Sequence, residues 1–219
     1  MVINKKSTLR GKRVLITAGP TWAAIDSVRV ISNTASGRTG ILLARDFKKL
    51  GAKVTLLLGP VGSCSLDKGI KMLRFSFFDE LRSLLERELA CVKYDAVIHT
   101  AAVSDYMAPR PYRRKIKSGI KGLRIRLSPT PKIINCIKRI SPFSLAVGFK
   151  FEPQASRGVL LREARGLMRF ARLDIAVANT IREGRYRAYI VGARKVYGPF
   201  TTKGMMSRGL ERLIGSQLL

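Results

Sequence analysis

The chain has 219 residues, enough for one sizeable domain, and its 46% of apolar residues predict a packed core, which excludes a globally disordered protein. Lys and Arg total 42 against 14 acidic residues, and the resulting charge of +28 favours anionic partners such as nucleic acid, anionic lipid or phosphorylated small molecules. Three cysteines without a C-x-x-C pair exclude a disulfide scaffold and favour a reduced, cytoplasmic setting, and no apolar run approaches the roughly 18 residues of a transmembrane helix.

Along the chain, apolar runs that end at glycine or proline alternate with amphipathic stretches, which is typical of strands interleaved with helices. Before the first run, the basic residues 1–13 lack the apolar segment of a signal peptide. We expect strands over 13–17, 54–58, 71–76, 95–100, 145–149 and 174–179, and helices over 41–50, 77–91, 131–140, 158–172 and 201–214. A small hairpin is expected from 187–191 and 194–197, and strict alternation at 123–127 predicts a half-exposed strand.

This order of elements predicts a three-layer, Rossmann-like α/β fold with a mostly parallel sheet, in a single domain over residues 1–219. Residues 104–121 break the rhythm, because they carry prolines and many charges without a helical period. Ligands of parallel sheets lie beyond the carboxyl ends of the strands. The strand ends at 18–37, 101–106 and 148–152 are therefore the candidate sites.

The first strand end opens a loop of small residues that leads into a helix. Bare backbone amides at Gly19 and Gly37, with the hydroxyl of Ser36, can hold a phosphate at a helix N-terminus. The segment is neither a G-x-G-x-x-G fingerprint nor a Walker loop, so a plain strand-to-helix connection is the alternative.

The second strand end carries Ala101 and Ala102, whose small side chains let a flat ligand lie against the backbone. Asp105, which follows them, can accept hydrogen bonds from a base or help to hold a metal through water, or it can cap a turn. His99 lies inside the apolar strand and is expected to be a core residue rather than a catalyst. Cys64, Cys91 and Cys136 have no partner in a recognisable arrangement and are assigned no chemistry.

Basic residues are densest over 110–126, and the cluster 113–117 is the most concentrated part of that stretch. It can act as a triphosphate clamp, as a solvated basic arm or as a contact to nucleic acid. Exposed aromatic residues usually accompany an RNA-binding surface, and Tyr106 and Tyr112 are the two that this region offers.

An ordered set of motifs resembles the phosphopantothenate–cysteine ligase (phosphopantothenoylcysteine synthetase) family over about residues 12–215. Each motif alone is weak, but the order is specific. The matching stretches are 14–21, 25–29, 31–33, 36–37, 51–55, 59–60, 101–106, 115–117, 148–149 with Glu152, and 174–179.

The resemblance implies an enzyme of coenzyme A synthesis. A nucleoside triphosphate with Mg²⁺ activates the carboxylate of 4′-phosphopantothenate, and the amine of cysteine then attacks the acyl-nucleotide. The family uses CTP or ATP, and the sequence does not decide between them. The flavin-dependent domain to which many microbial members are joined has no counterpart in these residues, so the resemblance implies no flavin. Homodimers with a strand arm at the subunit contact are usual in the family, and the resemblance implies that residues 106–127 form this protruding strand arm or flap.

Site residues follow from the resemblance by position. Asn33 and Lys115 match catalytic residues of the family. The residue at Asn33 contacts the acyl-nucleotide in the family, and the residue at Lys115 lies on a flexible flap. The expected substrate contacts are Asn33 and Arg38. The expected nucleotide contacts are Gly19, Ser36, Gly37, Ala101, Ala102, Asp105, Lys115, Phe149, Arg165 and Arg169.

The helix before Asp174 departs from the family pattern. The family has two nucleotide-binding lysines where this chain has Leu167 and Ala171. Arg165 and Arg169 keep the four-residue spacing but lie two positions earlier in the sequence. If the helix is shifted by two residues relative to the family, the arginines lie on the face of the two lysines; without this shift they lie on roughly the opposite face. Two alternatives to the ligase stay open, a diverged relative that binds nucleic acid and an enzyme for another phosphorylated acid.

Overall fold

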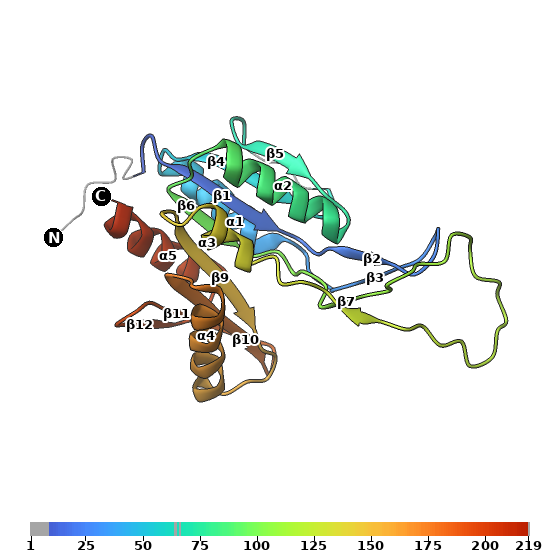
Figure 1. The fold of residues 1–219 in the computed structure, drawn as a ribbon. Coiled ribbons are helices and arrows are strands. Elements are labelled where there is room, and N and C mark those ends of the chain that lie inside the picture. Colours follow the sequence, from blue (N-terminus) through green and yellow to red (C-terminus); the bar gives the residue numbers. More distant parts are fainter. Residues whose placement is uncertain (1–8, 64, 66, 219) are drawn as a thin grey trace.

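The computed structural model describes residues 9–63, 65 and 67–218, so the basic residues 1–8 and Cys64 lie outside it. An eight-stranded sheet with the order β12-β11-β10-β9-β6-β1-β4-β5 forms its centre (Figure 1). The six strands from β10 to β5 are parallel, whereas β11 and β12 are antiparallel. These strands are β1 (Arg13–Ala18), β4 (Lys53–Leu58), β5 (Lys71–Arg74), β6 (Ala96–His99), β9 (Leu145–Phe151), β10 (Ile175–Arg182), β11 (Arg185–Val191) and β12 (Val196–Phe200).

Helices cover both faces of the sheet and complete the three layers (Figure 1). One face packs against α1 and α5, and the other packs against α2, α3 and α4. Their bounds are α1 (Arg38–Lys49), α2 (Phe78–Cys91), α3 (Asn135–Ile140), α4 (Arg157–Ala171) and α5 (Lys203–Leu218). Within the described ranges, no helix combines the length and the apolar composition that crossing a membrane requires.

The strand residues alternate between the two core layers because successive side chains point to opposite faces. In β1, Val14 and Ile16 pack toward α1 and α5, while Leu15 packs toward α2. All three are fully buried, as a strand with helices on both sides requires. The predicted Rossmann-like fold with its mostly parallel sheet and C-terminal hairpin is confirmed.

Two helices start three or more residues from their predicted positions, and one predicted strand does not form. The helix expected at 41 begins at Arg38, and the helix expected at Pro131 begins at Asn135. The strand predicted over 123–127 is wrong, since these residues have no strand structure. The alternation of apolar and polar residues predicts a strand with one buried and one solvent-exposed face. Among the described residues of the single chain, however, no strand pairs with this segment, and Leu123 and Leu127 are 45% and 39% exposed.

A long arm extends from the carboxyl edge of the sheet, as predicted for residues 106–127, but it contains more of the chain (Figure 1). Two small antiparallel pairs build it, and residues 108–127 form its outermost loop. At its base, the ring of Trp22 meets Phe77 edge-on at 6.0 Å between ring centroids. The pairs are β2 (Trp22–Ala24) with β3 (Val30–Ser32), and β7 (Tyr106–Met107) with β8 (Ser128–Pro129).

Gly40, in the first turn of α1, lets this helix pack directly on β1. A Cβ atom there would lie 2.4 Å from Ala18 Cβ and 2.7 Å from Thr100 Oγ1. We expect Gly40→Ala to destabilise the fold by about 1–3 kcal/mol and to lower Tm by about 2–12 °C in a thermal melt. Gly166→Ala is the matched control, because it also lies in a helix and a Cβ there meets no atom within 4 Å. An equal loss in both variants would contradict the packing argument.

Candidate active site

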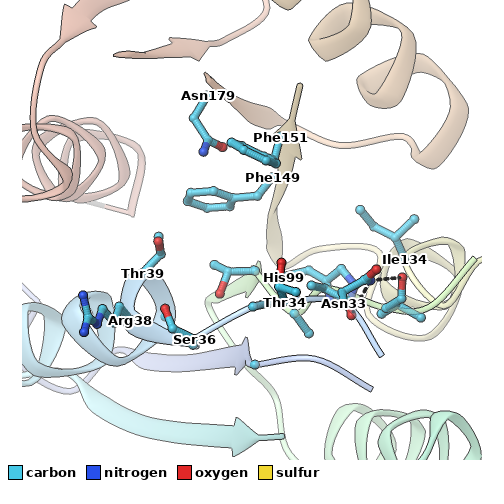
Figure 2. Close-up of a pocket in the computed structure, with 18 of the residues that line it drawn as sticks. Asn33, Thr34, Ser36, Arg38, Thr39, His99, Ile134, Phe149, Phe151 and Asn179 are labelled. Carbon is cyan, nitrogen blue, oxygen red and sulfur yellow. Dashed lines mark hydrogen bonds between the residues drawn. The ribbon is translucent and has the colours of Figure 1, made fainter. Parts of the chain in front are cut away.

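The carboxyl ends of β1, β6, β9 and β10 surround a cavity of about 710 Å³ (Figure 2). This volume is in the usual range for small-molecule sites. The described residues that line it are 19, 33–40, 99–103, 105, 130–134, 149, 151, 179, 181, 186 and 203. Seven separate parts of the chain, from Gly19 to Lys203, therefore meet at the edge where parallel sheets bind ligands.

One end of the cavity is suited to an anion. Gly37, with φ of 67°, precedes α1 without a side-chain cap, so the N–H groups of the first helical turn stay available. Arg38 and Lys203 both line the cavity from the N-termini of α1 and α5. Burial, together with the positive charge of Arg38, lowers the pKa of Lys203 below its ordinary value. An anion between these two cations would relieve their repulsion.

Asn33 bridges two of the strand-end loops at the opposite side of the cavity (Figure 2). Its Nδ2 donates to the carbonyl oxygens of Ala102 at 3.1 Å and Val103 at 3.3 Å. Oδ1 has no hydrogen-bond partner among the described residues. With Nδ2 as the donor, Oδ1 of Asn33 is left as an uncharged acceptor for an N–H or O–H group of a ligand.

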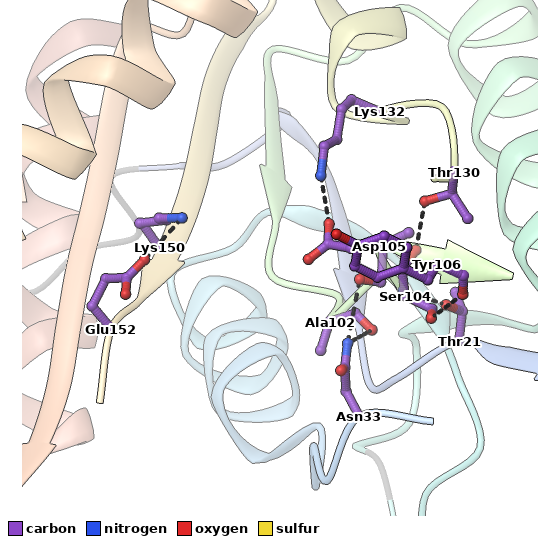
Figure 3. Close-up of polar contacts among 11 residues, drawn as sticks. Thr21, Asn33, Ala102, Ser104, Asp105, Tyr106, Thr130, Lys132, Lys150 and Glu152 are labelled. Atoms are coloured by element: carbon purple, nitrogen blue, oxygen red, sulfur yellow. Dashed lines mark hydrogen bonds and ion pairs between the residues drawn. The ribbon is translucent and has the colours of Figure 1, made fainter. Parts of the chain in front are cut away.

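Asp105 lies on a loop that a set of hydrogen bonds holds in place (Figure 3). The N–H of Ser104 donates to Thr21 Oγ1 at 2.9 Å, and Thr130 Oγ1 donates to the carbonyl of Ser104 at 2.6 Å. Asp105 itself pairs with Lys132, and both side chains are more than half exposed. Because exposed ion pairs contribute only about 0–1 kcal/mol, this carboxylate can change partners at low cost.

Aromatic and amide side chains form the wall beyond the end of β9 (Figure 2). Phe149 and Phe151 come from β9, and Asn179 follows from β10. A base or another flat group can lie against these rings. His99, at the floor, is buried as predicted, and its Nδ1 is 2.8 Å from Thr17 Oγ1. Burial lowers the pKa of His99 to about 4, so the ring is neutral at pH 7.

Most of the predicted site residues lie together in this cavity. Arg165 and Arg169 do not, since they are on the exposed side of α4, while Leu167 packs toward Gly148. Neither arginine lines the cavity in this arrangement of the chain, so their expected contact with the nucleotide has no support from the structure. Lys115 also lies outside, in the arm loop. The predicted residues that do line the cavity are Gly19, Asn33, Ser36, Gly37, Arg38, Ala101, Ala102, Asp105 and Phe149.

Sequence reasoning missed several lining residues. Lys203 follows Arg38 by 165 residues, and no local pattern marks it except its position at a helix start. Lys132 had a weak signal, the Pro131–Lys132 pair after a strand-like segment. Asn179 ends a matched motif but had no assigned role. Chain-distant residues of this kind become visible only when the sheet order is known.

Asp26 ties the two halves of the arm together. Its buried carboxylate accepts hydrogen bonds from the N–H groups of Val28 and Arg29, both at 2.8 Å, and of Ile116 at 3.0 Å. The Arg29 guanidinium also donates to it. The Ile116 N–H above all holds the pKa of Asp26 well below its usual range. This bond fixes the residue next to Lys115.

Asp26→Asn should release the outer loop of the arm, because an amide cannot accept all of these hydrogen bonds. We expect amide hydrogen exchange over residues 112–120 to accelerate about tenfold or more, with the sheet unaffected. Because the pKa of Asp26 is depressed, its stabilising contribution is complete above the unfolded-state pKa of about 3.9, and it is lost progressively as pH falls from there through the lower folded-state pKa. Glu183→Gln, at the exposed turn after β10, is the control. Unchanged exchange in Asp26→Asn would contradict the anchoring role.

Metal ligands are sparse at the cavity. Among its described lining residues Asp105 is the one acid, and the described chain has no group of three or more His, Cys, Asp or Glu placed to hold a metal ion. Mg²⁺ commonly binds through one or two carboxylates together with substrate phosphates. The donor set therefore fits Mg²⁺ that is held jointly by a phosphorylated substrate, with Asp105 as the protein's contribution.

A Rossmann-like sheet whose carboxyl edge carries an uncapped helix N-terminus and two nearby cations is typical of proteins that bind phosphorylated ligands. The family can be stated more narrowly, because the model of the DNA/pantothenate metabolism flavoprotein C-terminal domain matches residues 9–189. The chain belongs to this family. The resemblance found in the motifs is thereby confirmed.

Known proteins support the same assignment. The chain is 39% identical over 175 residues to the coenzyme A biosynthesis bifunctional protein CoaBC of Thermococcus kodakarensis, covering 80% of this chain and 43% of that protein. It thus spans less than half the length of this relative. Its fold is similar to the C-terminal domain of a CoaBC protein, with a TM-score of 0.80, 25% identity and coverage of 97% and 98%. It is also similar to a Cab2 mutant in complex with phosphopantothenate-cysteine, with a TM-score of 0.78, 17% identity and coverage of 95% and 88%.

Proposed function

We propose that this chain joins 4′-phosphopantothenate to cysteine in a nucleotide-dependent ligase reaction of coenzyme A synthesis. The observation that carries the proposal is the single cavity in which Asn33, Asp105, Phe149 and the Arg38–Lys203 pair meet. Membership of the family and the likeness to CoaBC proteins support the same reaction.

In the first step, a carboxylate oxygen of phosphopantothenate attacks the α-phosphorus of the nucleotide, and pyrophosphate leaves. Arg38, Lys203 and the N-terminus of α1 would hold the phosphates and neutralise the charge that gathers on pyrophosphate. Phe149 would lie against the base. Asp105 would help to hold Mg²⁺ together with the phosphates, and the ion would supply further positive charge there.

In the second step, the amine nitrogen of cysteine attacks the activated acyl carbon, and the nucleotide monophosphate leaves. No electron transfer is involved, so the reaction needs no flavin. Oδ1 of Asn33 would accept a hydrogen bond from the attacking amine or from the acyl chain, and the neutral amide does this without competing for protons. Positioning two polyanions and an amine in one cavity would account for most of the rate enhancement.

We further propose that the chain acts as a homodimer with paired arms. Apolar side chains of the arm are exposed in the single chain, and such a surface is typical of a protein interface. Lys115, on the same arm, would then reach the cavity of the partner subunit. The exposed arm residues include Val28, Val30, Tyr106, Tyr112, Ile120, Leu123 and Leu127.

The double variant Leu123→Asp/Leu127→Asp should be monomeric, because buried charges would oppose arm pairing. Sedimentation equilibrium should give twice the 24.3 kDa chain mass for the wild type and 24.3 kDa for the variant. Phe143→Asp is the control, since this side chain is fully exposed on the body of the fold, before β9. A monomeric wild type, or a variant that still dimerises, would contradict the arm pairing.

The ligase activity is tested by incubating the purified chain with phosphopantothenate, cysteine, Mg²⁺ and either CTP or ATP. We expect one pyrophosphate per phosphopantothenoylcysteine with at least one nucleotide, and the faster nucleotide identifies the base preference. Without cysteine, pyrophosphate release should stop after about one turnover, as the acyl-nucleotide accumulates. No pyrophosphate release with either nucleotide would overturn the proposal.

A further inference from the structure

A second cavity, of about 270 Å³, lies at the opposite edge of the sheet, where the parallel strands begin. Arg13, Lys53 and Lys71 line it as the first residues of β1, β4 and β5, and Lys48 joins them from the last turn of α1. Strand β1 separates this cavity from the candidate active site by roughly 15–20 Å, at about 3.3 Å per residue. The two cavities share no lining residue.

The charge of this second cavity is not balanced by the protein. Lys71 pairs with Glu88 at 2.9 Å, but Arg13, Lys48 and Lys53 have no ion-pair partner among the described residues. Four cations against one carboxylate leave a local charge of +3. Cations gathered in a concave surface focus a positive potential that favours a multivalent anion.

The acids around the cavity are already engaged. Asp95 accepts the backbone N–H of Arg13 at 2.7 Å and pairs with Lys12 at 3.7 Å. Neither interaction neutralises the guanidinium of Arg13. This group therefore keeps its fork of N–H donors, which matches phosphate oxygens in a bidentate way.

A buried network holds the back of the cavity rigid. The hydroxyl of Tyr94 donates to Glu88 at 2.7 Å and lies 3.0 Å from Thr55 Oγ1, and all three residues are at most 7% exposed. Burial alone would raise the pKa of Glu88, but hydrogen bonds from Lys71 and Tyr94 lower it, so the carboxylate stays ionised. The ionised carboxylate in turn fixes the ammonium of Lys71 at the cavity wall.

We propose that this cavity binds a pyrophosphate group, free or as part of a phosphorylated small molecule, through Arg13, Lys48 and Lys53. Its volume is just below the range of sites for drug-sized ligands, which suits a compact group with several charges. Nucleic acid fits it less well, because proteins that bind a duplex contact many phosphates along an extended surface.

Isothermal titration with inorganic pyrophosphate tests the proposal on the full chain. We expect Arg13→Gln/Lys53→Gln to lose one saturable site, with affinity for it reduced at least about tenfold. Lys49→Gln/Lys93→Gln is the matched control, because it removes the same charge from exposed residues at the same edge that do not line the cavity. The control should keep the affinity within about twofold.

Ligase turnover separates this proposal from the proposed function. The Arg13→Gln/Lys53→Gln variant should keep the thermal stability and the ligase turnover of the wild type. If the wild type itself shows no ligase activity, that result contradicts the proposed function and leaves the pyrophosphate site to be judged by the titration alone. Equal pyrophosphate binding by the variant, the control and the wild type would overturn the second site. A single-stranded 12-nucleotide RNA serves as the competing probe; if the variant loses RNA binding but keeps pyrophosphate binding, the proposal is also overturned.

Discussion

Asn33→Ala should abolish most of the ligase turnover while nucleotide still binds. The change removes the one neutral amide that links the strand-end loops and offers an acceptor to the ligand. Loss of one such preorganised polar group costs about 10²- to 10³-fold in kcat in other enzymes. We expect that loss here, with the nucleotide Kd changed by less than about threefold.

Thr34→Ala is the control for this experiment, because Thr34 also lines the cavity and is exposed. It should retain kcat within about threefold, since no hydrogen bond of its side chain holds the loops together. Both variants should melt at the wild-type temperature. Wild-type kcat in Asn33→Ala, measured by pyrophosphate release, would contradict the role assigned to the amide.

Arg38→Gln/Lys203→Gln should produce the largest loss of kcat/KM. Each cation is expected to make charge-assisted hydrogen bonds to phosphate, worth about 1.5–3 kcal/mol. Removing both should therefore lower kcat/KM by about 10²- to 10⁴-fold. Most of the loss should appear as a higher KM for the nucleotide, because these side chains contact phosphates before and during the reaction.

Arg165→Gln/Arg169→Gln is the matched comparison, since it removes the same charge from the exposed side of α4. The geometry predicts kcat/KM within about threefold of the wild type for this variant. If this pair has the larger effect, the nucleotide contacts expected from the family spacing are correct and the Arg38–Lys203 site is wrong.

The fold was predictable because local patterns and packing agree along most of the chain. The run at β1 is apolar from Val14 to Ile16, where helices cover both faces, and the amphipathic period of α2 matches most of its buried residues. The strand ends then follow from topology, which is why Asn33, Asp105 and Phe149 could be placed at one edge of the sheet. These predictions needed only the alternation of elements and the loop motifs.

The remaining features depend on contacts between distant parts of the chain. Lys203 meets Arg38 only because α1 and α5 pack on the same face, and no local pattern reports that. The arm was underestimated, since the Asp26–Ile116 contact joins residues 90 positions apart, and β2 and β3 are too short to show a strand period. The alternation at 123–127 resembles a strand, but a strand needs a partner that one chain does not supply.

The most direct measurement is a crystal structure of the chain with phosphopantothenate and a nonhydrolysable CTP analogue. The account predicts the triphosphate between Arg38 and Lys203, the base against Phe149, and the phosphopantothenate carboxylate beside Asn33, in one continuous cavity. A nucleotide bound elsewhere, or an acid and a nucleotide in separate sites, would contradict it.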